Sequence, residues 1–101
     1  MDNKVFYGEL YDIYGELLTD KQKMYFEDYY FEDLSLGEMA DNYKVTRNAI
    51  FKQIHIVIDR LLNYESKLKL YEKKLKIEDI IKKSNDLELN KCLESIIYSD
   101  N

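Results

Sequence analysis

The chain has 101 residues, of which 46% are hydrophobic and 35% charged, and its formal net charge is −5. This length is enough for one modest hydrophobic core, and the composition excludes an intrinsically disordered chain. The absence of proline, together with long stretches of helical periodicity, predicts an all-α helical bundle folded as a single domain over residues 1–101.

The N-terminal helices are expected within residues 1–53. Residues 5–18 carry one apolar helical face, made of Phe6, Leu10, Ile13, Tyr14 and Leu17. Thr19 is placed to cap a second helix over residues 20–31, with Gln22 completing a capping box. The core residues predicted for that helix are Met24, Tyr25, Tyr29 and Phe31.

A helix-turn-helix is predicted over residues 35–53. Ser35 and Glu38 have the spacing of a capping box, and Thr46 is placed to cap a second helix. Between these caps one amphipathic stripe repeats at intervals of three and four residues, through Leu36, Met39, Ala40 and Tyr43. Lys44 occupies a turn position where many helix-turn-helix motifs have glycine, and a left-handed residue there would cost about 1 kcal/mol.

The second helix of such a motif enters the DNA major groove and reads bases with residues near its N-terminus. The candidate DNA-binding residues are Lys44, Thr46, Arg47, Asn48, Phe51 and Lys52. Two short capped helices also occur in bundles that bind nothing. In addition, residues 19–62 hold six basic and eight acidic side chains, which argues for weak binding or a protein-facing surface.

A long connecting helix is predicted over residues 54–76, because apolar positions alternate at three and four residues. The candidate dimer seam comprises Ile54, Val57, Leu61, Tyr64, Leu68, Tyr71 and Leu75. In a parallel homodimer Arg60 would face Glu65 and Lys67 would face Glu72. The same edge could instead pack on its own chain, since a 3.5-residue period cannot be told from 3.6 over so few turns.

Two C-terminal helices are expected within residues 77–98, separated at Ser84 and Asn85. Cys92, the one cysteine, lies in an apolar stripe and is predicted to be a small buried residue rather than a reactive thiol.

No pattern indicates an enzyme, a cofactor or a metal site. His55 is the one histidine, and Asp59 is its one neighbour at helical spacing, too few ligands for a metal. No glycine-rich phosphate loop or histidine-based nucleophile pair is present. No apolar run of about 18 residues occurs and the start is unlike a secretion signal, so we expect a cytoplasmic protein without a membrane partner.

Four blocks carry a resemblance to a known family: residues 18–23 (LTDKQK), 29–40 (YYFEDLSLGEMA), 45–50 (VTRNAI) and 64–71 (YESKLKLY). In their order and spacing they resemble the YlxM family, small bacterial helix-turn-helix proteins similar to region four of sigma factors. The resemblance implies an all-helical DNA-binding protein. It also implies a regulatory or accessory role with the signal recognition particle GTPase or its RNA, because the family's genes lie beside those of that pathway. Ile56 departs from the more polar stretch usual in the family and favours a protein-facing surface.

Overall fold

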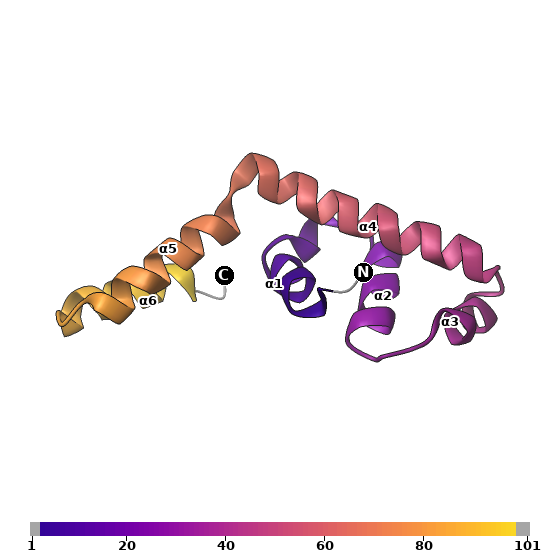
Figure 1. Ribbon diagram of the computed structural model, residues 1–101, viewed down its shortest axis with the longest axis horizontal. Coiled ribbons are helices and arrows are strands. Elements are labelled where there is room, and N and C mark those ends of the chain that lie inside the picture. The colour runs from indigo at the N-terminus through magenta and orange to yellow at the C-terminus, as the bar shows by residue number, and fades with distance from the viewer. Residues whose placement is uncertain (1–2, 99–101) are drawn as a thin grey trace. The chain divides into compact units, whose positions relative to one another are not determined.

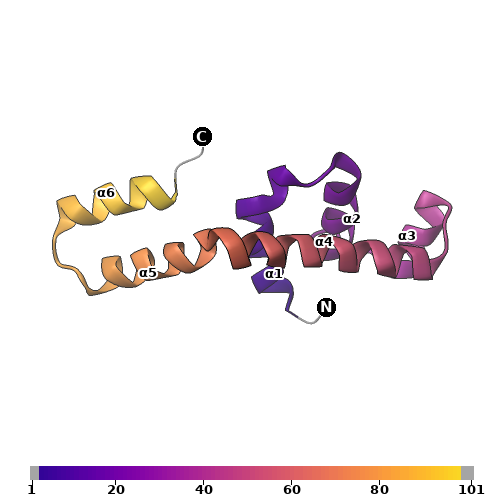
Figure 2. The same ribbon diagram turned by 90° about the horizontal axis from the view of Figure 1, so that it is seen from above.

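The fold is described from a computed structural model over residues 3–98 (Figures 1 and 2). The elements are α1 (Lys4–Tyr14), the 3-10 helix η1 (Gly15–Leu17), α2 (Asp20–Tyr30), α3 (Leu36–Tyr43), α4 (Arg47–Leu68), α5 (Leu70–Lys83) and α6 (Leu87–Ile97). No strand occurs in this range, which confirms the predicted all-α class. The structure divides into two compact units, the first ending at Leu68 and the second beginning at Lys69, and the single domain over residues 1–101 stays a prediction.

In the first unit α4 is the element on which the others pack. It contacts α1, α2 and α3, and α2 also contacts α3. All three lie on one side of α4 in Figure 1. The largest fully buried side chains come from all four helices: Leu10, Tyr14, Phe26, Met39, Ile50, Ile54, Val57 and Leu61. Fully burying one aliphatic side chain stabilises a fold by about 1.5–3 kcal/mol, so burial of the α4 face against the other helices makes a large contribution to the stability of this unit.

Aromatic residues join α1, α2 and α4. The Tyr11 and Phe26 rings stack with centroids 4.4 Å apart, and Phe26 stacks on Tyr30 at 4.5 Å. The Tyr14 hydroxyl donates a 2.6 Å hydrogen bond to the Glu65 carboxylate of α4. The tyrosines of this unit therefore combine ring packing with hydroxyl groups that reach carboxylates.

Three residues predicted to face the core do not. Leu17 is exposed because the chain tightens into η1, which turns its side chain away from the α1 face. Met24 and Phe31 are exposed, whereas Phe26 and Tyr30 are buried. Aromatic residues lie on both sides of α2, so periodicity alone could not select its buried face.

The predicted helix caps are confirmed. Thr19 and Gln22 form a capping box at α2, and Ser35 and Glu38 form one at α3. Thr46 caps α4, since its Oγ1 accepts a 3.1 Å hydrogen bond from the Ala49 N–H. These interactions satisfy backbone donors that the first turn of each helix leaves without an intrahelical partner.

The prediction of one helix over residues 54–76 is wrong. Lys69 has a left-handed backbone (φ 55°), and α5 begins after it. The helix therefore ends at a residue that is neither proline nor glycine, and the local sequence contains no recognised stop signal.

The candidate dimer seam is divided at the same place. Ile54, Val57 and Leu61 are buried in the core of the first unit, and Tyr64 is half-buried there. Leu68 is exposed at the end of α4, while Tyr71 and Leu75 lie on α5. A second α4 could not pack on the first three positions unless the core of the first unit opened.

The second unit is a helical hairpin in which α5 packs on α6. Asn90 Nδ2 donates to the carbonyl oxygens of Ser84 at 3.3 Å and Ile81 at 3.5 Å, which holds the connection between the helices. Cys92 is exposed, contrary to the prediction, because the outer side of α6 does not face α5, the helix it packs on in this unit. None of the helices within residues 3–98 is both long and apolar enough to cross a membrane.

Replacing Lys44 by glycine is expected to raise the free energy of unfolding by about 1 kcal/mol. Lys44 has φ 57° and ψ 46°, a conformation that strains residues with a Cβ and suits glycine. Chemical denaturation monitored by helicity would measure the change. Lys44→Ala is the control, because alanine retains the strain; equal stability of the two variants would contradict the assignment.

The neighbours Leu61 and Leu62 provide a test of the core. Leu61 is 0% exposed and Leu62 is 38% exposed. Leu61→Ala is expected to lower the free energy of unfolding by about 2–5 kcal/mol, because it leaves a cavity, and Leu62→Ala by less than about 1 kcal/mol. Similar losses measured by urea denaturation for both variants would refute this packing of α4.

Candidate nucleic-acid interface

The α3–α4 pair forms the helix-turn-helix. α3 ends at Tyr43, and the Val45 N–H donates a 3.0 Å hydrogen bond to the carbonyl oxygen of Ala40. With the left-handed Lys44 this bond forms a Schellman-type helix end, which reverses the chain within three residues. Thr46 then begins α4, so the geometry of the turn follows from backbone hydrogen bonds on both sides.

Contacts with α2 hold α3 in place beneath this turn. The Tyr43 hydroxyl donates a hydrogen bond to Asp28 of α2, and the Tyr43 ring meets the Tyr25 ring edge-on at 4.7 Å. Burial and the adjacent Asp28 carboxylate raise the pKa of Tyr43, so its hydroxyl remains protonated and keeps donating. At the other end of α3, hydrogen bonds from Ser35 lower the pKa of Glu38 and keep that capping carboxylate charged.

The predicted DNA-binding residues lie together on the turn and the first two turns of α4. Lys44, Thr46, Arg47, Asn48, Phe51 and Lys52 are all exposed. A spacing of four residues places Asn48 and Lys52 on the helical face opposite the buried Ile50 and Ile54, and the exposed Phe51 lies at the edge between the two sides. This part of α4 therefore has a buried side that fixes it and a free side that can meet a ligand.

Arg47 also packs against α3. A Cβ built on Gly37 would lie 2.8 Å from an Arg47 Nη and 3.1 Å from its Cζ, so the guanidinium covers the place where Gly37 has no side chain. The two residues are ten positions apart and no periodic pattern links them, so this contact could not be predicted from the sequence. It shows that the two helices of the motif meet at the start of α4.

The electrostatics of this surface are mildly positive. Residues 35–60 carry four basic side chains (Lys44, Arg47, Lys52 and Arg60) and three acidic ones (Glu38, Asp41 and Asp59). Within residues 3–98, no carboxylate forms an ion pair with Lys44, Arg47 or Lys52. These three cations remain available to phosphate, although such a small excess of positive charge makes a weak electrostatic anchor.

Apolar side chains are also exposed around these cations. Val45 in the turn, Phe51 and Ile56 are each more than 40% exposed. The Phe51 ring meets the half-buried His55 ring edge-on with centroids 4.4 Å apart. Exposed apolar residues mixed with cations suit a protein surface as well as a nucleic acid.

The arrangement has no features of a metal or catalytic site. The described residues 3–98 contain no group of three or more side chains that could hold a metal ion. His55 packs beside Phe51. A hollow of about 240 Å³ lies in the first unit and is lined by Thr19, Lys21, Gln22, Tyr25 and Gln53, none of which is a nucleophile activated by a base.

Comparison with known proteins identifies the family. Residues 1–98 match the family model UPF0122, described as "Putative helix-turn-helix protein, YlxM / p13 like". The UPF0122 protein of Ureaplasma urealyticum serovar 10 is 47% identical over 87 residues, which cover 86% of this chain and 88% of the relative. That of Staphylococcus epidermidis is 44% identical over 86 residues, with 81% and 78% covered. The "Probable UPF0122 protein" of Mycoplasma mycoides is 40% identical over 91 residues, with 88% and 80% covered.

The family description and the all-α fold indicate no catalytic function. The match extends over both units of the chain, so the α5–α6 hairpin belongs to the family pattern as well as the helix-turn-helix. The chain therefore belongs to the UPF0122 family of YlxM/p13-like helix-turn-helix proteins.

Proposed function

We propose that this protein is a DNA-binding regulator that binds duplex DNA through the start of α4. The observation that supports this most directly is the exposed start of α4, where Asn48 and Lys52 lie opposite the buried Ile50 and Ile54 and the exposed Phe51 flanks them. A helix fixed in this way at the end of a helix-turn-helix matches the geometry that reads a major groove.

Each exposed residue has a role that follows from its chemistry. Asn48 can form two hydrogen bonds with adenine, and Arg47 can form two with guanine, each discriminating against a wrong base by about 1–3 kcal/mol. Lys44 and Lys52 bind phosphates on either side of the groove. Thr46 keeps its capping role, because its Oγ1 already accepts the Ala49 N–H. Phe51 supplies an apolar contact, such as one with a thymine methyl group.

Few phosphates are neutralised in this arrangement, so the affinity is modest and falls with salt by only about one unit of slope for each phosphate contact. Specificity then depends on Arg47 and Asn48, since phosphate contacts position a protein on DNA without reading its sequence.

Replacing both Lys44 and Lys52 by glutamine is expected to weaken binding to all duplexes alike and to reduce the slope of log affinity against log salt by about one per lysine. Arg47→Ala is expected to reduce the preference among sequences instead. Fluorescence anisotropy with the DNA upstream of the protein's own operon, and with a scrambled duplex, would measure both effects.

Lys67→Gln is the control for position: it removes one positive charge from the last turn of α4, so its effect is compared with half of the effect of the double variant. The proposal would be abandoned if the wild-type protein bound neither duplex at about 50 mM salt, where phosphate contacts are strong. If the Lys67 variant lost as much DNA affinity per charge removed as the double variant, a defined DNA interface at the start of α4 would also be excluded.

A second candidate function is that of an accessory factor for the signal recognition particle, which modulates its GTPase without binding specific DNA. The exposed apolar residues Val45, Phe51 and Ile56 favour it, as does the net charge of −5. In this case the partner is the GTPase or its RNA, as the resemblance to the YlxM family implies.

For this second function, Ile56→Asp is expected to reduce capture of the purified GTPase about tenfold and to remove any effect on GTP hydrolysis, because it places a charge in an apolar contact. Leu62→Asp, on the same helix at similar exposure, is the control. Nuclease treatment separates the partners, since it abolishes capture that depends on RNA. Failure of both capture and turnover assays with the wild-type protein would exclude this function.

A further inference from the structure

The α5–α6 hairpin has no core of its own. No residue of α5 or α6 is fully buried. Six large aliphatic side chains of these helices are between 45% and 74% exposed: Leu70, Leu75, Ile80, Leu87, Leu89 and Ile96. A hairpin of about 30 residues is below the size that can bury enough apolar surface to be stable alone, so it needs a second layer.

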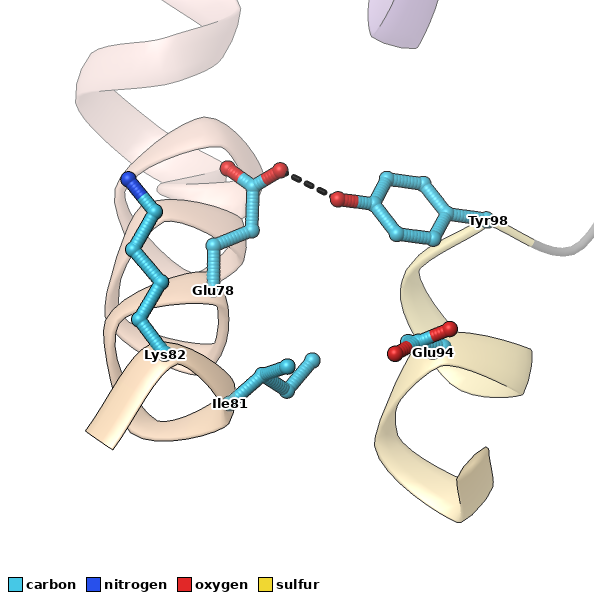
Figure 3. A pocket seen from close by; sticks show the side chains of 5 residues that line it. All are labelled: Glu78, Ile81, Lys82, Glu94 and Tyr98. Carbon is cyan, nitrogen blue, oxygen red and sulfur yellow. Dashed lines mark hydrogen bonds between the residues drawn. The ribbon is translucent and has the colours of Figure 1, made fainter. Parts of the chain in front are cut away.

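One side of this hairpin is polar. Glu78, Ile81, Lys82, Glu94 and Tyr98 line an open pocket of about 300 Å³ between the two helices (Figure 3). The Tyr98 hydroxyl donates a hydrogen bond to Glu78, and Lys74 Nζ lies 5.5 Å from the Tyr98 ring centroid. Charged groups and hydrogen bonds therefore lie on this side, together with the exposed Leu75 and Leu87.

The other side of the hairpin is apolar. At about 100° per residue, Ile80 lies roughly half a turn from Glu78 and Lys82 on α5. Leu89 and Ile96 lie roughly half a turn from Glu94 and Tyr98 on α6. The half-buried Ile77 and Leu93 lie towards the junction of the helices. We call this surface the apolar side of the hairpin: Ile77, Ile80, Leu89, Leu93 and Ile96.

We propose that this side binds the same surface of a second copy of the chain, so that two hairpins form an intermolecular four-helix bundle. Charge supports this occupant. α5 has five lysines and three carboxylates, whereas α6 with its cap Asp86 has three carboxylates and one lysine. The net charges are therefore +2 and −2, and a two-fold axis parallel to the helices sets each α5 against the α6 of the second copy.

The same symmetry explains why a second copy fits this surface. The apolar side is bordered by a basic helix and an acidic helix, so its complement must carry the two signs in reverse order. Another copy turned about that axis presents this order, and it supplies equal apolar area. Near the connection, Lys83 of one copy then lies across from Glu88 of the other. This dimer leaves the α4 core intact, unlike a seam through Ile54, Val57 and Leu61, and it does not depend on the ligand of α3–α4.

Sedimentation equilibrium of the full chain tests the proposal. The wild-type protein is expected to have about twice the monomer mass of 12.2 kDa, and the double variant Ile80→Glu, Leu89→Glu the monomer mass. Leu75→Glu, Leu87→Glu is the matched control, because it makes the same changes in the same helices on the pocket side. It is expected to remain dimeric, and helicity measured by circular dichroism verifies that both variants are folded.

A charge reversal tests the arrangement of the helices. Glu88→Lys is expected to weaken the dimer about tenfold, because it faces lysine in the second copy at two symmetric places. Adding Lys83→Glu is expected to recover most of that loss, although Lys83 also pairs with Asp79 at 2.9 Å. If instead α5 of one copy packed on α5 of the other, adding Lys83→Glu would not recover the dimer affinity lost by Glu88→Lys.

Three results would overturn the proposal. The first is a monomeric wild-type protein across the concentrations tested, which would mean that the apolar side is covered within one chain. The second is a dimer that survives Ile80→Glu, Leu89→Glu and dissociates in the control variant. The third is a dimer unaffected by either pair of changes, which would place the contact outside the hairpin.

Discussion

Burial of the α4 face against α1, α2 and α3 is the interaction on which the first unit depends. Ile50, Ile54, Val57 and Leu61 repeat at three and four residues, and all are removed from solvent. The same burial fixes the rotation of α4 about its axis. Asn48, Phe51 and Lys52 are presented outward because their neighbours on the helix are held inward, so the stability of this unit and the geometry of its candidate interface have a common cause.

The exposed surface at the start of α4 carries both cations and apolar side chains. Its cations form no ion pairs with the carboxylates of residues 3–98, and its net charge is slightly positive. Apolar side chains are exposed beside them. A strong DNA binder normally gains most of its affinity from phosphates, whereas this surface has only a few cations for that purpose. A weak, salt-sensitive DNA contact and a protein contact therefore remain the two functions that its physical chemistry supports.

The two units differ in how they are stabilised. The first encloses a core of residues from four helices, while the hairpin has polar groups on one side and uncovered aliphatic residues on the other. A surface of the second kind gains free energy only by meeting another apolar surface. For this reason the hairpin, and not α4, is the element from which an assembly of this protein is best built.

The sequence by itself determined the helical class, the three helix caps and the exposed residues of the helix-turn-helix. These features depend on the spacing of residues that are close together in the chain. In each cap, for example, a side-chain oxygen accepts a hydrogen bond from a backbone N–H only three residues away. Tertiary structure decided the buried face of α2 and the contact of Arg47 with Gly37. Both result from residues distant in the chain competing for the same space, which no periodicity encodes. The left-handed Lys69 that divides the predicted long helix also has no counterpart in the periodicity. Only packing could show that the first half of the predicted dimer seam belongs to the chain's own core.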